Sequence, residues 1–156
     1  MSPRLKQFLE ENHVPYQLLF SGEEAFTAQE IAARLHVSGK KLAKPVFFKA
    51  DGRLHMAVLP ADRRLDLNKA ARLVGAARAS LAREEEFAGR FPDCEVGAEP
   101  PIGRLYGLDT LLDEHLRQFD TVVFLGGDRR EAVELGRADY ERLAEPGSGD
   151  ICQPWQ

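Results

Sequence analysis

The chain has few cysteines and no long apolar run. Its 156 residues include two cysteines, Cys94 and Cys152, and neither has a partner at metal-ligand spacing. The longest apolar stretches, such as residues 122–125, are far shorter than the roughly 20 residues that span a bilayer. Residues 1–13 carry acidic side chains and lack the continuous apolar region of a secretory signal. We therefore expect free thiols, no membrane span and a cytoplasmic protein.

Local catalytic motifs are also missing. No serine lies in a Gly-x-Ser-x-Gly elbow, and no phosphate loop of the form Gly-x-x-x-x-Gly-Lys-Ser/Thr is present. The four histidines are scattered, with no His-Glu-x-x-His motif and no Cys/His pairs at zinc spacing. The sequence supports neither a serine hydrolase nor a P-loop nucleotidase. We expect no cofactor and no metal, since a metal site would have to be assembled from residues distant in the sequence.

What the chain does contain is the composition of a globular domain. Hydrophobic residues make up 44%, charged residues 29% and aromatic residues 8%, all close to the averages of folded proteins. The length fits a single domain over residues 1–156, built around one core. We predict that residues 145–156 form a loose tail, although Trp155 is large enough to dock on the body.

Positive charge is concentrated in one segment of an acidic chain. The net charge is −4, yet residues 40–83 hold eleven Lys or Arg against three acids, a net +8, which leaves −12 for the rest. A basic face of this kind fits a ligand that carries phosphates. An ordinary solvated surface rich in Lys and Arg fits the same numbers, so both interpretations stay open.

Helical and strand patterns of apolar residues follow one another along the chain. The predicted helices begin at Pro3, at Thr27 with Glu30 in a capping box (residues 26–35), at the caps Asp66 and Ser80, and at residue 138. The predicted strands are residues 16–20, two runs within 44–60, residues 121–125 and residues 131–135. Interleaved helices and strands indicate an α/β or α+β class with a mixed sheet.

Two dipeptides that contain glycine indicate turns. Asp51-Gly52 joins the two runs within residues 44–60 and favours a tight hairpin. Pro45 cannot donate a ladder hydrogen bond, so we expect its end of the strand at an edge or a bulge. Gly126-Gly127 follows a predicted strand and fits either a hairpin turn or an anion-binding nest.

Periodicity stops between residues 92 and 108. This stretch holds three prolines and three glycines, and we predict a long structured loop of the kind that is usually functional in a compact domain. Gly97 lets the main chain approach a ligand closely, while Pro100 and Pro101 fix φ and remove two hydrogen-bond donors. The loop therefore suits a rigid pocket wall.

Three segments match a known family in order and at compatible spacing. They are LAKPVFFKADGRLHMAVLPADRRLDLNKAARLVG (residues 42–75), FPDCEVGAEPPIG (residues 91–103) and VVFLGGDRREAVEL (residues 122–135). The sequence resembles the YbaK/ProX family, also called the prolyl-tRNA synthetase-associated editing domain, over a core of about residues 27–143. The resemblance implies a mixed, barrel-like β-sheet core surrounded by helices. It also implies hydrolysis of the ester bond between a wrong amino acid and the terminal adenosine of a tRNA.

The resemblance assigns roles to particular residues. Lys44 in LAKPV corresponds to the family's best-known functional side chain, and we expect Lys44 and Gly97 to carry catalysis. The family's glycine-proline loop corresponds to residues 97–103, where Ile102 stands at a position that is frequently aromatic. The expected substrate-binding residues are Ala98, Glu99, Pro100, Pro101, Ile102, Gly103, Gly126 and Gly127.

The implied reaction needs no nucleophilic side chain. An aminoacyl ester is already activated, so an enzyme can position a water and stabilise the developing oxyanion. Lys44 would hold the ester carbonyl or a terminal phosphate as a point charge, and backbone groups of the loop would complete the site. A second, small pocket selects amino acids such as alanine, cysteine or serine, because one methylene is worth only ~1–3 kcal/mol to a synthetase.

The leading hypothesis is a trans-editing aminoacyl-tRNA deacylase that acts on a mischarged tRNA, alone or with a synthetase, and not on DNA or a membrane. A second hypothesis is a non-catalytic module that binds tRNA or a synthetase through residues 40–83. A third is a hydrolase of another small ester or amide, because a fold does not fix a function. On the residues alone, Lys44 also fits a surface lysine at a strand edge, and residues 97–103 also fit a structural crossover loop.

Overall fold

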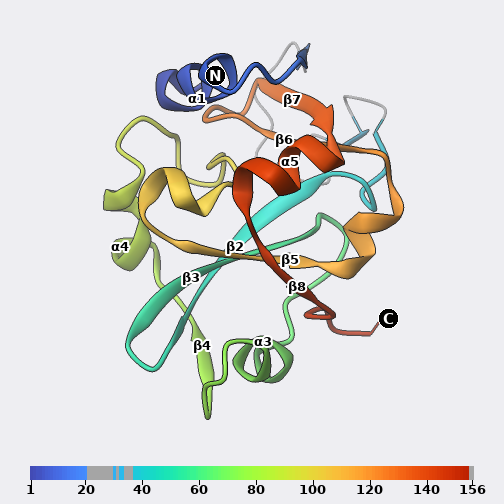
Figure 1. The fold of residues 1–156 in the computed structure, drawn as a ribbon. Helices are drawn as coiled ribbons and strands as arrows, with labels where there is room; N and C mark the ends of the chain where they lie inside the picture. Colours follow the sequence, from blue (N-terminus) through green and yellow to red (C-terminus); the bar gives the residue numbers. More distant parts are fainter. Residues whose placement is uncertain (21–29, 31, 34–36, 155–156) are drawn as a thin grey trace.

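The computed structural model describes residues 1–20, 30, 32–33 and 37–154 (Figure 1). The helices are α1 (Pro3–Glu11), α3 (Leu67–Leu73), α4 (Glu84–Phe87) and α5 (Arg137–Ala144), with 3-10 helices η1 (Ala88–Arg90), η2 (Gly103–Tyr106) and η3 (Glu114–Gln118). The strands are β1 (Tyr16–Phe20), β2 (Ala43–Ala50), β3 (Arg53–Pro60), β4 (Ala79–Leu81), β5 (Asp109–Asp113), β6 (Thr121–Leu125), β7 (Glu131–Gly136) and β8 (Gly147–Gly149). The predicted mixture of helices and strands is confirmed.

The strands form two sheets. The smaller sheet is antiparallel with the order β1-β7-β6, and the larger one has the order β4-β2-β3-β5-β8. The larger sheet is mixed, because β3, β5 and β8 run parallel while β2 pairs antiparallel with β3 and β4. An isolated parallel bridge between Leu42 and Val123 links the two sheets. The barrel-like core that the resemblance implied is wrong in this respect, because among the described residues the sheets do not close into a barrel.

The predicted hairpin is present at the centre of the larger sheet. β2 and β3 pair in continuous register from Ala43–Pro60 to Ala50–Arg53, and Asp51 and Gly52 have φ of 51° and 77°. Positive φ at both central residues defines the tight turn whose twist matches that of the strands.

At Pro45, β2 is paired with β3 on one side and, within the described residues, with no strand on the other. Pro45 sits opposite Val58 of β3, whereas β4 pairs with β2 over Phe48–Ala50 alone. The missing N–H of Pro45 therefore breaks no ladder in the described part of the chain, which confirms the edge position expected for it.

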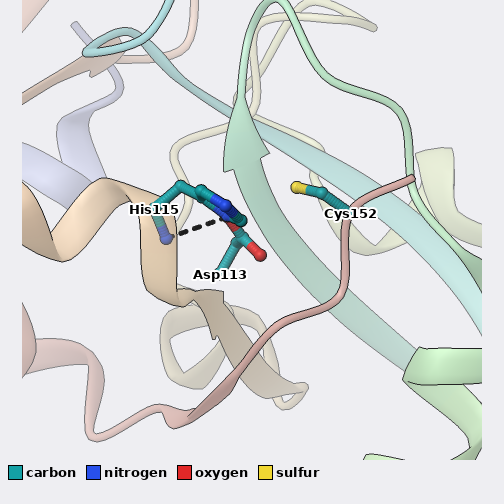
Figure 2. Close-up of side chains that lie close together, drawn as sticks. All are labelled: Asp113, His115 and Cys152. Atoms are coloured by element: carbon teal, nitrogen blue, oxygen red, sulfur yellow. Dashed lines mark hydrogen bonds and ion pairs between the residues drawn. The ribbon is translucent and has the colours of Figure 1, made fainter. Parts of the chain in front are cut away.

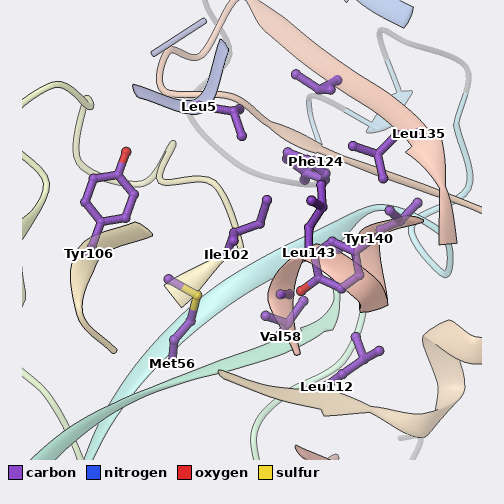
Figure 3. Packing of buried hydrophobic residues seen from close by; sticks show 14 of the residues in the cluster. Leu5, Met56, Val58, Ile102, Tyr106, Leu112, Phe124, Leu135, Tyr140 and Leu143 are labelled. Carbon is purple, nitrogen blue, oxygen red and sulfur yellow. The ribbon is translucent and has the colours of Figure 1, made fainter. Parts of the chain in front are cut away.

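The largest buried cluster takes side chains from both sheets and from the helices beside them. Leu5 of α1, Met56 of β3, Phe124 of β6 and Leu143 of α5 are at most 2% exposed and face a common interior (Figure 3). Ile102, from the loop before η2, packs in the same cluster. Each side chain of this size contributes ~1.5–3 kcal/mol when it is fully buried. The core thus fixes both sheets, α5 and one end of the long loop relative to one another.

The C-terminal residues are ordered, so the prediction of a loose tail is wrong for residues 147–153. β8 extends the larger sheet beside β5, and Ile151 and Cys152 have no exposed surface. Asp66 N donates to Ile151 O at 2.8 Å, which ties this segment to the start of α3. Sequence pattern missed the segment because its strand is three residues long and contains two glycines. Trp155 lies outside the described residues.

One predicted helix start is wrong and one lies largely outside the described residues. Ser80 lies within β4, which pairs with Phe48–Ala50, and the following helix begins after Arg83 instead. The backbone N–H of Arg83 donates to the Glu86 carboxylate at 3.0 Å, which satisfies the helix start without Ser80. Of residues 26–35 the structure describes 30, 32 and 33, which are helical. Within the described chain, every helix is too short or too polar to cross a membrane.

Candidate active site

Lys44 lies near the start of β2 with its ammonium group partly buried. Strand alternation places its side chain on the same face as those of Val46 and Phe48. Its Nζ donates a hydrogen bond to Ala61 O at 3.1 Å. Burial lowers the pKa of Lys44 below its usual value, nearby Cys152 and Asp62 oppose this shift, and Arg64 adds to it. The Lys44 ammonium group thus lies at the edge of the larger sheet and contacts Ala61, the residue that follows β3.

The long loop and the Gly126-Gly127 turn are joined by backbone hydrogen bonds. Gly127 N donates to Ala98 O, and Glu95 N donates to Gly127 O, both at 2.8 Å. The turn connects β6 to β7 as an antiparallel hairpin, which confirms the hairpin interpretation of the sequence. Two of the segments predicted to form the site therefore lie together.

Gly97 is an exposed residue of this loop and has a backbone conformation that favours glycine. Its φ is 91°, and a Cβ added there would lie 2.9 Å from Nη2 of Arg129. Arg129 donates to Val96 O through Nη2 and pairs with Glu95 at 3.4 Å. The guanidinium group of Arg129 thus lies directly beside the Gly97 backbone.

The Glu99 carboxylate accepts a hydrogen bond from the backbone N–H of Gly97. Both of its carboxylate oxygens accept from Gly97 N, at 3.0 and 3.1 Å, and the side chain is 3% exposed. Burial raises the pKa of Glu99, while the backbone bonds and Arg129 oppose this shift. The amide of Gly97 therefore already has an acceptor, and the Arg129 guanidinium lies where a side chain at this position would project.

The rest of the predicted loop is buried in the protein. Ala98 and Ile102 have no exposed surface, and Pro100 and Pro101 are also buried. The Tyr140 hydroxyl donates to Pro101 O at 2.6 Å, which fastens the proline pair to α5. These residues lie behind the exposed Gly97 and support it, so a direct contact between Ile102 and substrate stays a prediction.

Gly103 ends the loop where two chain segments meet closely. Its N–H donates to Thr110 Oγ1 at 2.9 Å. A Cβ at this position would lie 2.6 Å from Thr110 Oγ1 and 2.7 Å from Leu108 O. Glycine is required there by packing, and the close contact anchors the loop to β5.

The N-terminus supports the glycine turn from the other side. Ser2 N donates to Gly126 O at 2.6 Å, and the terminal ammonium lies 3.3 Å from the Asp128 carboxylate. A cavity of about 340 Å³ lies between these residues and Cys94. Burial raises the pKa of Cys94 to about 11, so its thiol stays protonated near neutral pH and is a poor nucleophile.

The bridge between the sheets relates Lys44 to the glycine turn. Leu42 and Val123 pair in parallel, so the chain beyond each residue runs in the same direction. Lys44 and Gly126-Gly127 both follow the bridge closely and therefore lie toward the same edge. Within the described ranges, no hydrogen bond or ion pair connects Lys44 to residues 97–103. The structure joins loop and turn directly, and the bridge brings the chain just before β2 next to β6.

Another cavity, of about 420 Å³, lies away from these residues. Arg53, His55 and Asp109 line it at the hairpin end of β3, and Arg104 and Glu145 line it near α5. None of the residues predicted for the site is among its lining residues. The cavity is therefore separate from the Lys44 edge.

Sequence reasoning missed Arg129 and the hydrogen bonds of Glu99. The signal for Arg129 was its place in GGDRR, directly after the glycine turn, but nothing in the sequence distinguishes it from Arg130. Its position depends on Glu95 and Val96, which lie more than thirty residues earlier in the chain. The observed cation beside a glycine can attract a phosphate or polarise a carbonyl group.

The chain is similar in sequence to one protein family and to a curated bacterial relative. Residues 22–143 match the family described as the aminoacyl-tRNA editing domain. The multifunctional Ser/Thr-tRNA deacylase ProXp-y of Escherichia coli (strain K12) is 37% identical over 92 residues, which cover 58% of this chain and 54% of the relative. This chain thus matches about half the length of that curated relative.

Two further similarities extend the comparison. The proline–tRNA ligase of Bacillus mycoides (strain KBAB4) is 29% identical over 85 residues, or 54% of this chain and 15% of the ligase. A solved structure proposed to be a trans-editing enzyme for prolyl tRNA synthetase has a TM-score of 0.80 and 26% identity, with 99% of each chain covered. The second similarity extends over nearly the whole fold.

Proposed function

The chain belongs to the aminoacyl-tRNA editing domain family, and on that premise we propose that it is a trans-acting deacylase of a mischarged tRNA carrying a small amino acid. The family match spans most of the chain, and one relative is named as a Ser/Thr-tRNA deacylase. The substrate is the ester bond between the amino acid and the terminal adenosine. A reaction on tRNA belongs to the cytoplasm, and no cofactor takes part in it.

The observation that carries the proposal is the assembly of loop and glycine turn around exposed Gly97. Gly127 fixes the loop by two backbone hydrogen bonds, and Glu99 holds the Gly97 amide in place. The absence of a side chain at Gly97 lets the Arg129 guanidinium lie against the backbone, and the proposed ester binds beside this cation and the rigid wall. A fixed wall suits this reaction, because orienting the ester and a water supplies much of the rate.

Two cations are proposed to bind the polar parts of the substrate. Lys44 is partly buried, so its charge is less screened than that of an exposed lysine. In the proposed complex it attracts the ester carbonyl or a terminal phosphate, and Arg129 supplies a second positive group beside Gly97. Both cations stabilise the negative charge that develops as water attacks. Water attack breaks the ester bond, and the adenosine oxygen leaves with a proton.

Small side chains are the proposed substrates because the wall is rigid. The loop beneath Gly97 is buried and packed against the core, so it cannot move back to admit a bulky amino acid without loss of packing. Alanine, cysteine and serine are the candidates, and threonine joins them through the name of the E. coli relative. A synthetase that charges the wrong small residue is the proposed partner, in agreement with the similarity to a proline–tRNA ligase.

The test is release of amino acid from a panel of mischarged tRNAs. We expect the purified chain to hydrolyse at least one small-residue ester faster than the buffer blank. Lys44→Ala should lower the rate on the order of 10²–10³-fold, the usual effect of removing one charge-stabilising group. Lys49→Ala, on the same strand, is the matched control because Lys49 pairs with Glu86 at 2.7 Å, away from the loop.

The results distinguish the three hypotheses. Hydrolysis that needs Lys44 and tolerates Lys49→Ala supports the deacylase, provided that circular dichroism shows both variants folded. Binding to tRNA that weakens steeply with salt, without turnover, supports a non-catalytic module that uses residues 40–83. Faster cleavage of a small acyl ester than of any charged tRNA supports a different hydrolase.

A further inference from the structure

Three potential metal ligands meet near the end of β5, away from Gly97 and its loop. Asp113 is the last residue of β5, His115 follows in η3, and Cys152 comes after β8 (Figure 2). One ligand atom from each residue lies within 4.8 Å of the other two. Figure 2 shows the Cys152 sulfur pointing toward the Asp113–His115 pair. Asp113 and His115 are close in the sequence, and the fold brings Cys152 to them from the distant C-terminal segment, so no sequence motif marks the cluster.

Asp113 and His115 are already oriented by the backbone. Asp113 has no exposed surface, and its Oδ1 accepts from Ile151 N at 3.0 Å. Its Oδ2 accepts from the His115 backbone N–H at 3.1 Å and lies 2.8 Å from His115 Nδ1. A carboxylate oxygen has more than one lone pair, so these bonds leave acceptor capacity on Asp113. The pair is preorganised rather than mobile.

Cys152 is positioned by hydrogen bonds that its backbone makes with residues near α3. It forms an isolated antiparallel bridge with Leu65, and its carbonyl accepts from Lys69 Nζ at 2.9 Å. The thiol has no exposed surface, while the side chain of His115 is 35% exposed. An ion can therefore reach the cluster past His115, and a solvent molecule can remain on that side.

The charges of the cluster suit a divalent cation. Asp113 and Cys152 both have no exposed surface, so a carboxyl group and a thiol lie close together in the interior of the free protein. A doubly charged ion bound to an ionised carboxylate, a thiolate and a neutral imidazole forms a site without net charge. Such neutrality matters because an uncompensated charge in the interior is costly.

We propose that Asp113, His115 and Cys152 form a binding site for a zinc-like divalent cation. Carboxylate oxygen, imidazole nitrogen and thiolate sulfur are all ligands that zinc accepts, and three protein ligands leave a fourth tetrahedral position for water on the exposed His115 side. On binding, the S–H bond of Cys152 breaks, a metal–sulfur bond forms, and the proton passes to solvent. His115 contributes the lone pair of one ring nitrogen and Asp113 a carboxylate lone pair.

Cobalt(II) titration of the full chain tests the site directly, because thiolate ligation gives a charge-transfer absorption band. We expect the band in the unaltered protein and its displacement by zinc, with about one proton released per ion near neutral pH, as thiol ligation requires. Cys94→Ser is the matched control, since Cys94 is the other cysteine and has Asp93 as a neighbour. That variant should keep the band, and Cys152→Ser should lose it.

A second variant tests the site in case Cys152→Ser fails to fold. His115→Gln alters a partly exposed side chain and should keep the fold, while weakening cobalt binding more than the roughly 10–100-fold that loss of an outer-shell partner costs. No band in the unaltered protein, or a band that survives in Cys152→Ser and disappears in Cys94→Ser, overturns the proposal. The cluster would then serve as a hydrogen-bonded anchor for the C-terminal segment.

Discussion

Gly97 meets two requirements that other residues cannot meet together. Its φ of 91° is strained for a residue with a Cβ, and its Cβ position is next to the Arg129 guanidinium. In the proposed site, a side chain there would also displace the Arg129 guanidinium from its place beside the ester. The residue is therefore the point where backbone conformation, a neighbouring cation and substrate access coincide.

Gly97→Ala should reduce turnover much more than it reduces stability. Backbone strain at positive φ costs roughly 1–2 kcal/mol. Turnover should fall on the order of 100-fold, because a substrate displaced by about 1 Å loses that much rate. Urea unfolding measures the first effect and deacylation the second.

Gly52→Ala is the control for strain alone. Gly52 has φ of 77°, but nothing lies within 4 Å of a Cβ built there. Its stability loss should resemble that of Gly97→Ala while deacylation stays unchanged. Equal losses of activity in the two variants would show that strain, and not the space beside Gly97, governs turnover.

Tyr140 fastens the proline pair, and its removal should loosen the loop from behind. Tyr140→Phe leaves the buried Pro101 carbonyl without the hydroxyl at 2.6 Å, which costs ~1–3 kcal/mol for an unsatisfied acceptor. We expect a lower urea midpoint with an unchanged slope. An unchanged midpoint would show that Pro101 O finds another donor, and the loop would not depend on α5.

The sequence predicted candidate site residues where a motif carried them and missed a neighbour whose contacts are distant. Lys44 and Gly97 were predicted from the resemblance, and their roles stay predictions; the structure places Lys44 near the start of β2 and Gly97 at a positive φ. Arg129 was not predicted, because its position depends on Glu95 and Val96 in a separate segment. Local sequence patterns do not predict contacts between residues so far apart in the chain.

At the scale of elements, local interactions were predictable and parallel pairings were not. The β2–β3 hairpin needs only Asp51-Gly52 and two apolar runs, so the sequence was sufficient. β5 pairs in parallel with β3, and β8 pairs in parallel with β5. Neither β5 nor β8 was predicted, since a parallel partner lies far away in the sequence and leaves no turn signal.

The two predicted helix caps should behave differently when they are removed. Asp66 Oδ1 accepts from Lys69 N at 3.0 Å at the start of α3, so Asp66→Ala should cost ~1 kcal/mol of unfolding free energy. Ser80→Ala should change stability by less than ~0.5 kcal/mol, because Ser80 is an exposed residue of β4 and caps no helix. Chemical denaturation of both variants measures the difference. A large loss in Ser80→Ala would contradict its assignment to β4.

Across the whole molecule, Glu86 should contribute to the loss of stability in acid. The Glu86 carboxylate accepts from the Arg83 backbone N–H and pairs with Lys49, which lowers its pKa from 4.5 to about 2. A depressed folded-state pKa stabilises the protein above pH 4.5, and this contribution is lost as the pH falls toward 2. Glu86→Gln should therefore flatten the decline of stability across this pH window.

Glu85→Gln is the matched control for the acid profile. Glu85 is its neighbour in α4 and is 69% exposed, with Arg83 at 3.4 Å. Because an exposed pair is strongly screened, this variant should follow the unaltered protein as the pH falls. Measuring the midpoint of urea unfolding at several pH values separates the two. Coinciding profiles for Glu86→Gln and the unaltered protein would contradict the prediction.

The parallel strands also set the order in which the molecule can be completed during synthesis. The larger sheet lacks its outer strand until Gly147–Gly149 has left the ribosome, and Ile151, with no exposed surface, emerges later still. Between the synthesis of β5 and that of β8, the nascent chain must hold an unpaired edge of β5 and an open apolar gap. Such edges invite association with other chains. Chaperone binding to the nascent chain should consequently persist until Ile151 has emerged.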